Sequence, residues 1–261
     1  QQGALRAFSV SASSYSSGEH VTFYEADREV APWQRSQRIA VRTRVGIEHL
    51  MASSAIPFVF PAGGLPIREG AQFFGDGSMR QSAPLSPAIH LGAERLFVVG
   101  AGRLHEPQPR TALNGSYPSL AQIGGHALSN IFLDALAVDI ERATRINQTV
   151  ALLESEGRSH PSLRPLEMLV VSPSERIDDI AARHVGDLPA GVRSMLRALG
   201  VSRQGEGAIG GGALTSYLLF ERAFTRELIA LGERDLMARE DEVRAFFRWP
   251  SVGESRPQRP Q

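Results

Sequence analysis

Two apolar runs, at residues 95–101 (RLFVVGA) and 166–171 (LEMLVV), constrain the fold of this chain more than any other feature. Short runs of this kind are typical of strands buried on both faces of a sheet. Helical periodicity occupies part of the interval between them, where Leu128, Phe132 and Leu136 lie on one apolar stripe. Strands that alternate with helices predict an α/β protein, with a mostly parallel sheet between helices in a three-layer core.

The beginning of the chain has the pattern of a β-hairpin. Residues 5–13 alternate apolar and polar side chains, residues 16–19 (SSGE) have the composition of a turn, and residues 20–24 return as a second strand. Residues 39–55 then follow a helix-like pattern that ends before Pro57. We therefore expect a hairpin followed by a helix.

A tight turn is predicted at residues 75–77 (GDG). It follows a loop rich in proline and glycine at residues 57–70 and a short strand-like segment at residues 72–74. The turn thus comes directly after a strand, which places its central residue, Asp76, at the edge of a sheet.

The character of the sequence changes after residue 174. Helical segments are predicted at residues 175–184, 189–199 and 213–247, the last of them broken at Gly232. The tail is rich in proline, arginine and glutamine, and we expect it to be disordered. The chain therefore divides into an α/β part at residues 1–174, a helical C-terminal portion at residues 175–250 and a tail at residues 251–261.

The chain contains neither cysteine nor lysine. These absences exclude disulfide scaffolds, cysteine nucleophiles, Schiff-base lysines and Ser–Lys dyads. The 28 arginines balance 28 acidic residues, so there is no basic excess of the kind that indicates a nucleic-acid partner. The seven histidines do not have the spacing of metal ligands, so we expect no metal site.

No stretch approaches the roughly 18 apolar residues of a membrane-spanning helix. The sequence begins QQGALRAF, without Met, so we expect the natural N-terminus to lie upstream, where an export signal would also lie. We expect the protein to be cytoplasmic or peripheral to a membrane.

Several short motifs between residues 50 and 100 occur in a distinctive order. They are residues 52–57 (ASSAIP), 60–61 (FP), 76–77 (DG), 84–88 (PLSPA) and 91–93 (LGA). In order and spacing, these motifs resemble the patatin-like phospholipase family. Residues 139–147 and 216–220 resemble a bacterial branch of the same family, so the resemblance covers nearly the whole chain.

Two elements of that family are absent from the sequence. The family's nucleophile lies in a Gly-x-Ser-x-Gly elbow, and no serine of this chain has glycine both two residues before it and two residues after it. The family's oxyanion hole is a glycine-rich loop further upstream, whereas the only comparable run, residues 210–212, lies downstream of Asp76. The resemblance therefore implies that residues 1–174 are the C-terminal part of a patatin-like domain, without its N-terminal strands.

The family hydrolyses acyl esters with a Ser–Asp dyad whose aspartate lies in an Asp-Gly-Gly or Asp-Gly-Ala motif. By this resemblance, Asp76 is the catalytic base, and Gly75 and Gly77 support it, with Gly77 allowing the backbone to turn sharply. Ser78 stands where the family has a small apolar residue. The alternative is that Asp76 and Gly77 form only a turn.

Phe58, Val59 and Phe60 form an apolar segment beside these motifs. The resemblance implies that they line a groove for the acyl chain. Core packing of the same residues is the alternative.

The resemblance implies a lipid acyl hydrolase that acts on phospholipid or another carboxylic ester and contacts a membrane peripherally. This chain would supply the aspartate, and the missing N-terminal segment, in cis or in trans, would supply the serine. No cofactor is implied, because the dyad and backbone N–H groups suffice for acyl transfer. The alternative is a non-catalytic fragment or pseudoenzyme that acts as a lipid-binding or interaction module.

Overall fold

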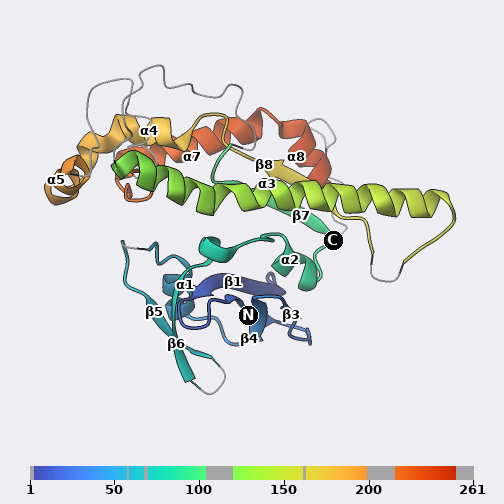
Figure 1. The fold of residues 1–261 in the computed structure, drawn as a ribbon. Coiled ribbons are helices and arrows are strands. Elements are labelled where there is room, and N and C mark those ends of the chain that lie inside the picture. Colours follow the sequence, from blue (N-terminus) through green and yellow to red (C-terminus); the bar gives the residue numbers. More distant parts are fainter. Residues whose placement is uncertain are drawn as a thin grey trace, which may run out of the picture. The chain divides into compact units, whose positions relative to one another are not determined.

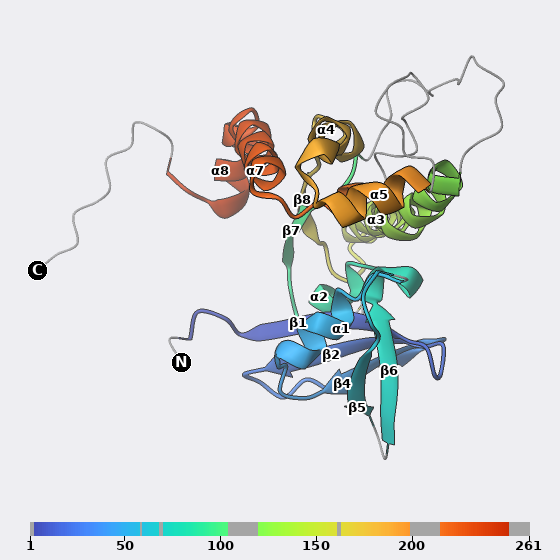
Figure 2. The ribbon, with the colours of Figure 1, turned by 90° about the vertical axis from the view of Figure 1, so that its left-hand side faces the viewer.

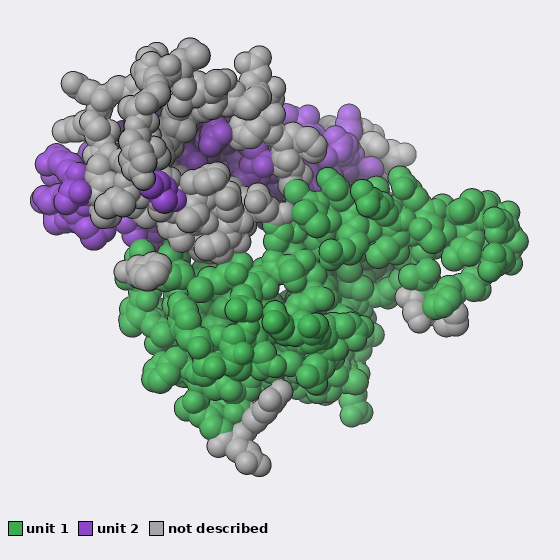
Figure 3. Space-filling view, in the orientation of Figure 1, with its two compact units in different colours: residues 1–95, 131–166 green, residues 96–130, 167–261 purple. Residues whose placement is uncertain are grey.

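The computed structural model describes residues 3–57, 59–67, 70–103, 120–160, 163–198 and 215–250, with helices and strands labelled in Figure 1. The chain forms two compact units, coloured separately in Figure 3. Unit 1 consists of residues 1–95 and 131–166, and unit 2 of residues 96–130 and 167–261. The domain boundaries proposed after residues 174 and 250 remain a prediction, and the tail at residues 251–261 lies outside the described residues.

Unit 1 is built on a six-stranded sheet with the order β3-β4-β2-β1-β6-β5. The strands are β1 (Ala7–Ser14), β2 (His20–Ala26), β3 (Gln34–Arg35), β4 (Arg38–Arg42), β5 (Gly63–Ile67) and β6 (Gly70–Asp76). β1 and β2 pair in antiparallel register from Ala7 opposite Ala26 to Ser13 opposite His20. This pairing confirms the predicted hairpin.

The expectation of a mostly parallel sheet is wrong for this unit. Among its described strand pairs, only β2 and β4 run parallel, and the others are antiparallel. The reason is local: β1–β2 and β5–β6 are joined by short connections, and a short turn can join only antiparallel neighbours. The unit is therefore a mixed α/β structure with a mostly antiparallel sheet.

Two further expectations in this region also need correction. Residues 39–55 do not form one helix, because Arg38–Arg42 form β4 and only Ile47–Ser53 form a helix, α1. The β-branched residues of β4 suit a strand, and pairing with β2 buries Ile39. The segment at residues 57–70 is not wholly a loop, since β5 lies within it and pairs with β6.

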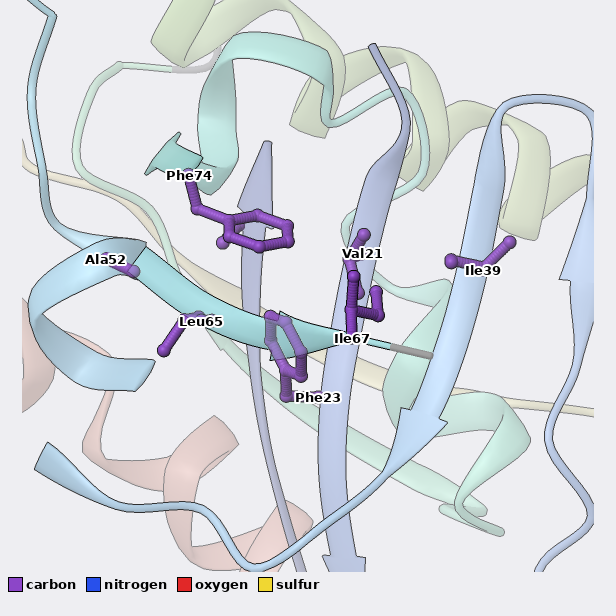
Figure 4. Packing of buried hydrophobic residues seen from close by; sticks show 8 residues of the cluster. Val21, Phe23, Ile39, Ala52, Leu65, Ile67 and Phe74 are labelled. Carbon is purple, nitrogen blue, oxygen red and sulfur yellow. The ribbon is translucent and has the colours of Figure 1, made fainter. Parts of the chain in front are cut away.

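The core of unit 1 lies on the face of the sheet that α1 covers (Figure 2). Phe23 occupies its middle (Figure 4) and contacts Phe74 edge-on, with 5.5 Å between the ring centroids. Phe23 also contacts the buried imidazole of His49 on α1, with 4.9 Å between the ring centroids. The cluster comprises Ala12, Val21, Phe23, Ile39, Ala52, Leu65, Ile67 and Phe74.

Two polar side chains of α3 (Leu120–Ser155) bind backbone groups elsewhere in unit 1. The buried Asp139 accepts a hydrogen bond of 3.0 Å from the Leu85 N–H, at the start of α2 (Ser86–His90). Asn147 donates to the Leu166 carbonyl at 2.7 Å and accepts from the Leu166 N–H at 2.9 Å. These contacts join the second half of α3 to two distant segments of the chain.

Unit 2 contains the helical C-terminal portion that the sequence predicts. Its described α-helices after residue 174 are α4 (Ile177–His184), α5 (Ala190–Ala198), α7 (Arg222–Met237) and α8 (Glu240–Phe247). The break predicted at Gly232 is wrong, since α7 continues through that residue. A glycine inside a helix costs about 1 kcal/mol, which the packing of Phe224 and Leu231 in the unit 2 core can offset.

The two apolar runs form strands, as predicted. They are β7 (Arg95–Val99) and β8 (Glu167–Val171), which pair as a two-stranded sheet. Burial on both faces is not observed: Leu96 is buried, whereas the side chain of Val99 is 71% exposed. A two-stranded sheet provides few neighbouring strands to cover side chains, so β7 is less buried than its apolar sequence predicts.

A charged network joins α4, α7 and the short 3-10 helix Val185–Asp187 in unit 2. His184 contacts the Asp187 carboxylate through Nδ1 at 2.7 Å and the Glu227 carboxylate through Nε2 at 2.6 Å. Arg183 pairs with Glu227 as well, and with Glu175 at 2.8 Å. Hydrogen bonds to Asp187 and Glu227 raise the pKa of His184 above its ordinary value, because both carboxylates favour the imidazolium.

The His184 network predicts a pH-dependent stability. A raised histidine pKa contributes stability that is fully present below the unfolded value of 6.5 and is lost as the pH rises through the folded value. We expect His184→Gln to lower the free energy of unfolding by about 1–3 kcal/mol near pH 6 and by less near pH 9. Denaturant unfolding of both proteins at both pH values measures this, and an equal loss at the two pH values would contradict it.

Candidate active site

Asp76 lies at the C-terminal end of β6, as the sequence predicts. It is also the N-cap of the 3-10 helix Gly77–Arg80. Its backbone N–H donates to the Ala55 carbonyl at 2.9 Å, just beyond α1, and it lies opposite Ala12 of β1. The position of its backbone is therefore fixed by three segments: β1, β6 and the chain that follows α1.

The carboxylate of Asp76 is buried, with 9% of the residue exposed. Its Oδ1 accepts a hydrogen bond of 2.8 Å from the Ser78 N–H. Burial raises the pKa of Asp76 above its ordinary value, although the hydrogen bonds from the backbone and side chain of Ser78 oppose the rise. A carboxylate with a raised pKa is a better general base near neutral pH than an exposed one.

Ser78 therefore has a role that the sequence did not reveal. Its backbone N–H donates the hydrogen bond that orients the Asp76 carboxylate, whereas the family motif has a small apolar residue at this position. The same contact is that of an N-cap, so capping of the 3-10 helix and service as a base are compatible in this geometry.

The glycines that flank Asp76 are required by close approach and not by a special turn conformation. Neither Gly75 nor Gly77 has a positive φ angle. A Cβ on Gly77 would lie 2.2 Å from the backbone carbonyl oxygen of Ser11 on β1. A Cβ on Gly75 would lie 2.3 Å from the hydroxyl of Tyr15, an exposed side chain that can move. Close contact between the start of the 3-10 helix and β1, and not a left-handed backbone conformation, therefore explains the glycine at position 77.

The apolar segment after α1 is only partly described. Val59 and Phe60 are 36% and 43% exposed, so neither belongs to the core of unit 1. The N–H groups of both donate to the Ile56 carbonyl, which folds the segment into a turn. Phe58 lies outside the described residues, and the acyl groove stays a prediction.

Two residues with no clear signal in the sequence, His20 and Ser13, lie near the backbone of Gly77. Burial lowers the pKa of His20, at the start of β2, to about 4, and the nearby backbone of Gly77 opposes that shift. Ser13 donates from its hydroxyl to the Gly77 carbonyl at 3.4 Å. The signal for His20 was weak, because His20 and Gly77 are brought together only by the order of the strands.

Comparisons of this chain with protein-family models, with curated proteins and with solved structures give no match. The described residues contain no cluster of three His, Asp or Glu side chains suited to a metal ion. No helix in the described part of the chain is long and apolar enough to cross a membrane. The resemblance to the patatin-like family therefore remains a prediction from the sequence motifs.

Proposed function

We propose that this chain is the aspartate-bearing part of a patatin-like lipid acyl hydrolase. The observation that carries the proposal is the buried carboxylate of Asp76, held at a strand end by the Ser78 N–H and raised in pKa by burial. A turn residue needs no burial, whereas a base benefits from it. The motifs around Asp76 resemble those of ester hydrolases, and this resemblance is the basis for proposing acyl-ester hydrolysis as the reaction.

In the proposed reaction, Asp76 accepts the hydroxyl proton of a serine as the serine oxygen attacks the ester carbonyl carbon. The tetrahedral intermediate collapses to an acyl-serine, and the protonated Asp76 returns its proton to the departing alcohol oxygen. Water then attacks the acyl-serine in the same way, with Asp76 as the base, and the acid and the free serine are released. Backbone N–H groups outside this chain would stabilise the oxyanion.

The finer features of the proposal follow from the family. The upstream segment would complete a three-layer patatin-like core and supply the serine, in cis or in trans. The substrate would be a phospholipid or another acyl ester, reached at a membrane surface from the cytoplasm or in a peripheral association. No metal or organic cofactor takes part in the proposed steps.

The proposal predicts that the 261-residue chain alone does not hydrolyse esters. Without an activated serine, Asp76 has no proton to accept. We expect the purified chain to hydrolyse a chromogenic short-chain ester no faster than the ester hydrolyses in buffer alone. Turnover abolished by a serine-directed phosphonate would contradict it.

The direct test adds the sequence encoded upstream of residue 1, expressed in cis or mixed in trans. We expect hydrolysis and phosphonate labelling of a serine only in that preparation. An upstream sequence without Gly-x-Ser-x-Gly, or a preparation that remains inactive on vesicles and on soluble esters, would reject the enzyme.

A non-catalytic lipid-binding module is the second candidate, and one observation favours it. The apolar side chains Ile47, Leu50 and Met51 are exposed on α1 at helical spacing, which puts them on one face. Such a module would sediment with phospholipid vesicles without hydrolysing them. Replacing all three residues by serine would then abolish sedimentation of the protein with the vesicles, whereas Asp76→Asn would not.

A further inference from the structure

Three arginine side chains lie at the end of the unit 1 sheet where β2 and β4 begin. Arg35 of β3 and Arg38 of β4 lie directly opposite each other in antiparallel register, on the two sides of a short connection. Arg80, the last residue of the 3-10 helix, donates to the side chain of Gln37 in that connection at 3.4 Å. Residues paired directly across two strands share one face of the sheet, so Arg35 and Arg38 extend to the same side.

The position of the Arg80 guanidinium is set by the two connections at this end of the sheet. Besides Gln37, it lies next to the turn between β1 and β2, since a Cβ on Gly18 would be 3.6 Å from its Nη2. The Gln37 carbonyl accepts from the His20 N–H at 2.9 Å, which ties the second connection to the start of β2. The three guanidinium groups are therefore held around one turn, at residues 35–38.

The positive charge of this turn is not compensated by the protein. Arg35 donates to the Gln34 carbonyl and Arg80 to the Gln37 amide, so both contact neutral groups. Within the residues that the structure describes, neither they nor Arg38 form an ion pair with a carboxylate. Like charges directly opposite each other on two strands destabilise the pairing, so the arrangement has an electrostatic cost unless an anion binds there.

Two nearby histidines respond to this charge. Burial, followed by the positive charges of Arg35 and Arg38, lowers the pKa of His90 on α2. His20 lies beside Arg38 in the register of β2 and β4. Burial lowers its pKa to about 4, and the charge of Arg38 adds to that shift against the opposing effect of the Gly77 backbone. Both shifts have the sign expected of positive charge that no carboxylate neutralises.

We propose that Arg35, Arg38 and Arg80 form a binding site for a phosphate group. A guanidinium can donate two parallel hydrogen bonds to a phosphate, and three guanidinium groups offer more donors than the two oxygens of a carboxylate can accept. A phosphate with up to two negative charges also balances the three arginines better than a singly charged carboxylate does. The phosphate belongs to a lipid headgroup or is inorganic phosphate in solution, and the arginines recognise the same chemical group in both.

The 3-10 helix connects this phosphate site to Asp76. Asp76 caps the start of that helix and Arg80 ends it, so at about 2 Å per residue their backbones are about 8 Å apart along its axis. A phospholipid carries its phosphate and its acyl esters on one glycerol, so a headgroup bound by the arginines would keep the esters near the helix that Asp76 caps. This role rests on the proposed function, whereas the binding of phosphate to the three arginines does not.

The test compares two triple variants of the 261-residue chain at constant ionic strength. The first replaces all three arginines of the turn and combines Arg35→Gln, Arg38→Gln and Arg80→Gln. The matched control replaces three other exposed arginines of unit 1, which form no ion pair with a described residue, and combines Arg6→Gln, Arg42→Gln and Arg44→Gln. Because both variants lose the same charge, the comparison separates binding at the turn from general attraction of an anion.

Two probes distinguish the sources of the phosphate. Inorganic phosphate is titrated against the ¹⁵N-labelled arginine side chains by NMR, and phosphatidylcholine vesicles with and without phosphatidic acid are used for sedimentation. We expect the dissociation constant to rise about tenfold or more in the first variant, which loses charge-assisted hydrogen bonds, and less than about twofold in the control.

Each outcome of these measurements decides the inference. Sedimentation that requires phosphatidic acid and is lost in the first variant alone assigns the phosphate to a lipid headgroup. Binding of inorganic phosphate without such sedimentation, lost in the same variant alone, assigns it to a soluble ligand. Failure of the wild-type chain to bind either probe, or an equal loss in the two triple variants, would overturn the inference.

Activity separates this inference from the proposed function. In the preparation that carries the upstream serine segment, the first variant should raise KM for a phospholipid about tenfold more than KM for the short-chain ester, which has no phosphate. An equal change in the two KM values would overturn the role in substrate binding. If the wild-type preparation hydrolyses neither substrate, the proposed function fails, and the binding measurements still decide whether the three arginines bind phosphate.

Discussion

Asp76→Asn, in the protein that carries the serine segment, should lower kcat by about 10²–10⁴ while the thermal midpoint changes little. Asparagine is nearly isosteric and keeps one acceptor oxygen for the Ser78 N–H, so the 3-10 helix remains capped. Its amide cannot accept a proton from serine, and loss of a general base costs rates of this order. Measuring kcat and the melting temperature of both proteins tests the two statements separately.

Asp139→Asn is a matched control for this substitution. Asp139 is also a buried carboxylate that accepts a backbone N–H, that of Leu85 at 3.0 Å, but it belongs to the α2 and α3 contacts of unit 1. Its substitution should leave kcat unchanged and alter stability only. If Asp76→Asn keeps near-wild-type kcat, Asp76 is a capping residue and the proposed dyad is wrong.

The location of Asp76 could be predicted because its signals are local. A short strand-like segment followed by Gly-Asp-Gly fixes a strand end and a turn within a few residues of sequence, and the structure has β6 end at Asp76. The hairpin of β1 and β2 was predictable for the same reason. In both cases, neighbours in sequence are also neighbours in space.

The sheet order could not be read in this way. Ile39 fits a helical pattern with the residues that follow it, and the pairing of β4 with β2 and β3 makes it a strand residue. Short segments with mixed patterns leave helix and strand nearly equal in local preference, and burial in the sheet decides between them. The resemblance to a mostly parallel family fold did not supply this pairing.

The surroundings of Asp76 were missed for a related reason. His20 and Ser13 lie near Gly77 because β1 lies between β2 and β6, and nothing near residue 77 indicates that order. The role of Gly77 was also misjudged, since a glycine in a turn motif suggests conformational freedom. Here the Ser11 carbonyl of the neighbouring strand requires the absence of a side chain.

That contact gives the second large expected effect, the destabilisation caused by Gly77→Ala. The new methyl would lie 2.2 Å from the Ser11 carbonyl oxygen, and the atom in the way belongs to the backbone of a paired strand. β1 and the 3-10 helix must separate, which would strain the pairing of β1 with β6. We expect the free energy of unfolding to fall by about 3 kcal/mol, at the upper end of typical overpacking costs.

Two glycines of β6, the strand before Gly77, serve as controls. A Cβ on Gly70 would meet no atom of the described residues within 4 Å, so Gly70→Ala should change stability by less than about 1 kcal/mol. A Cβ on Gly75 would meet the hydroxyl and ring edge of Tyr15, an exposed side chain and not backbone, so Gly75→Ala should cost less than Gly77→Ala. Denaturant unfolding of the three variants gives the order directly. Equal losses at Gly75 and Gly77 would show that the β1 backbone yields as easily as an exposed side chain, and that close packing does not fix the place of Asp76.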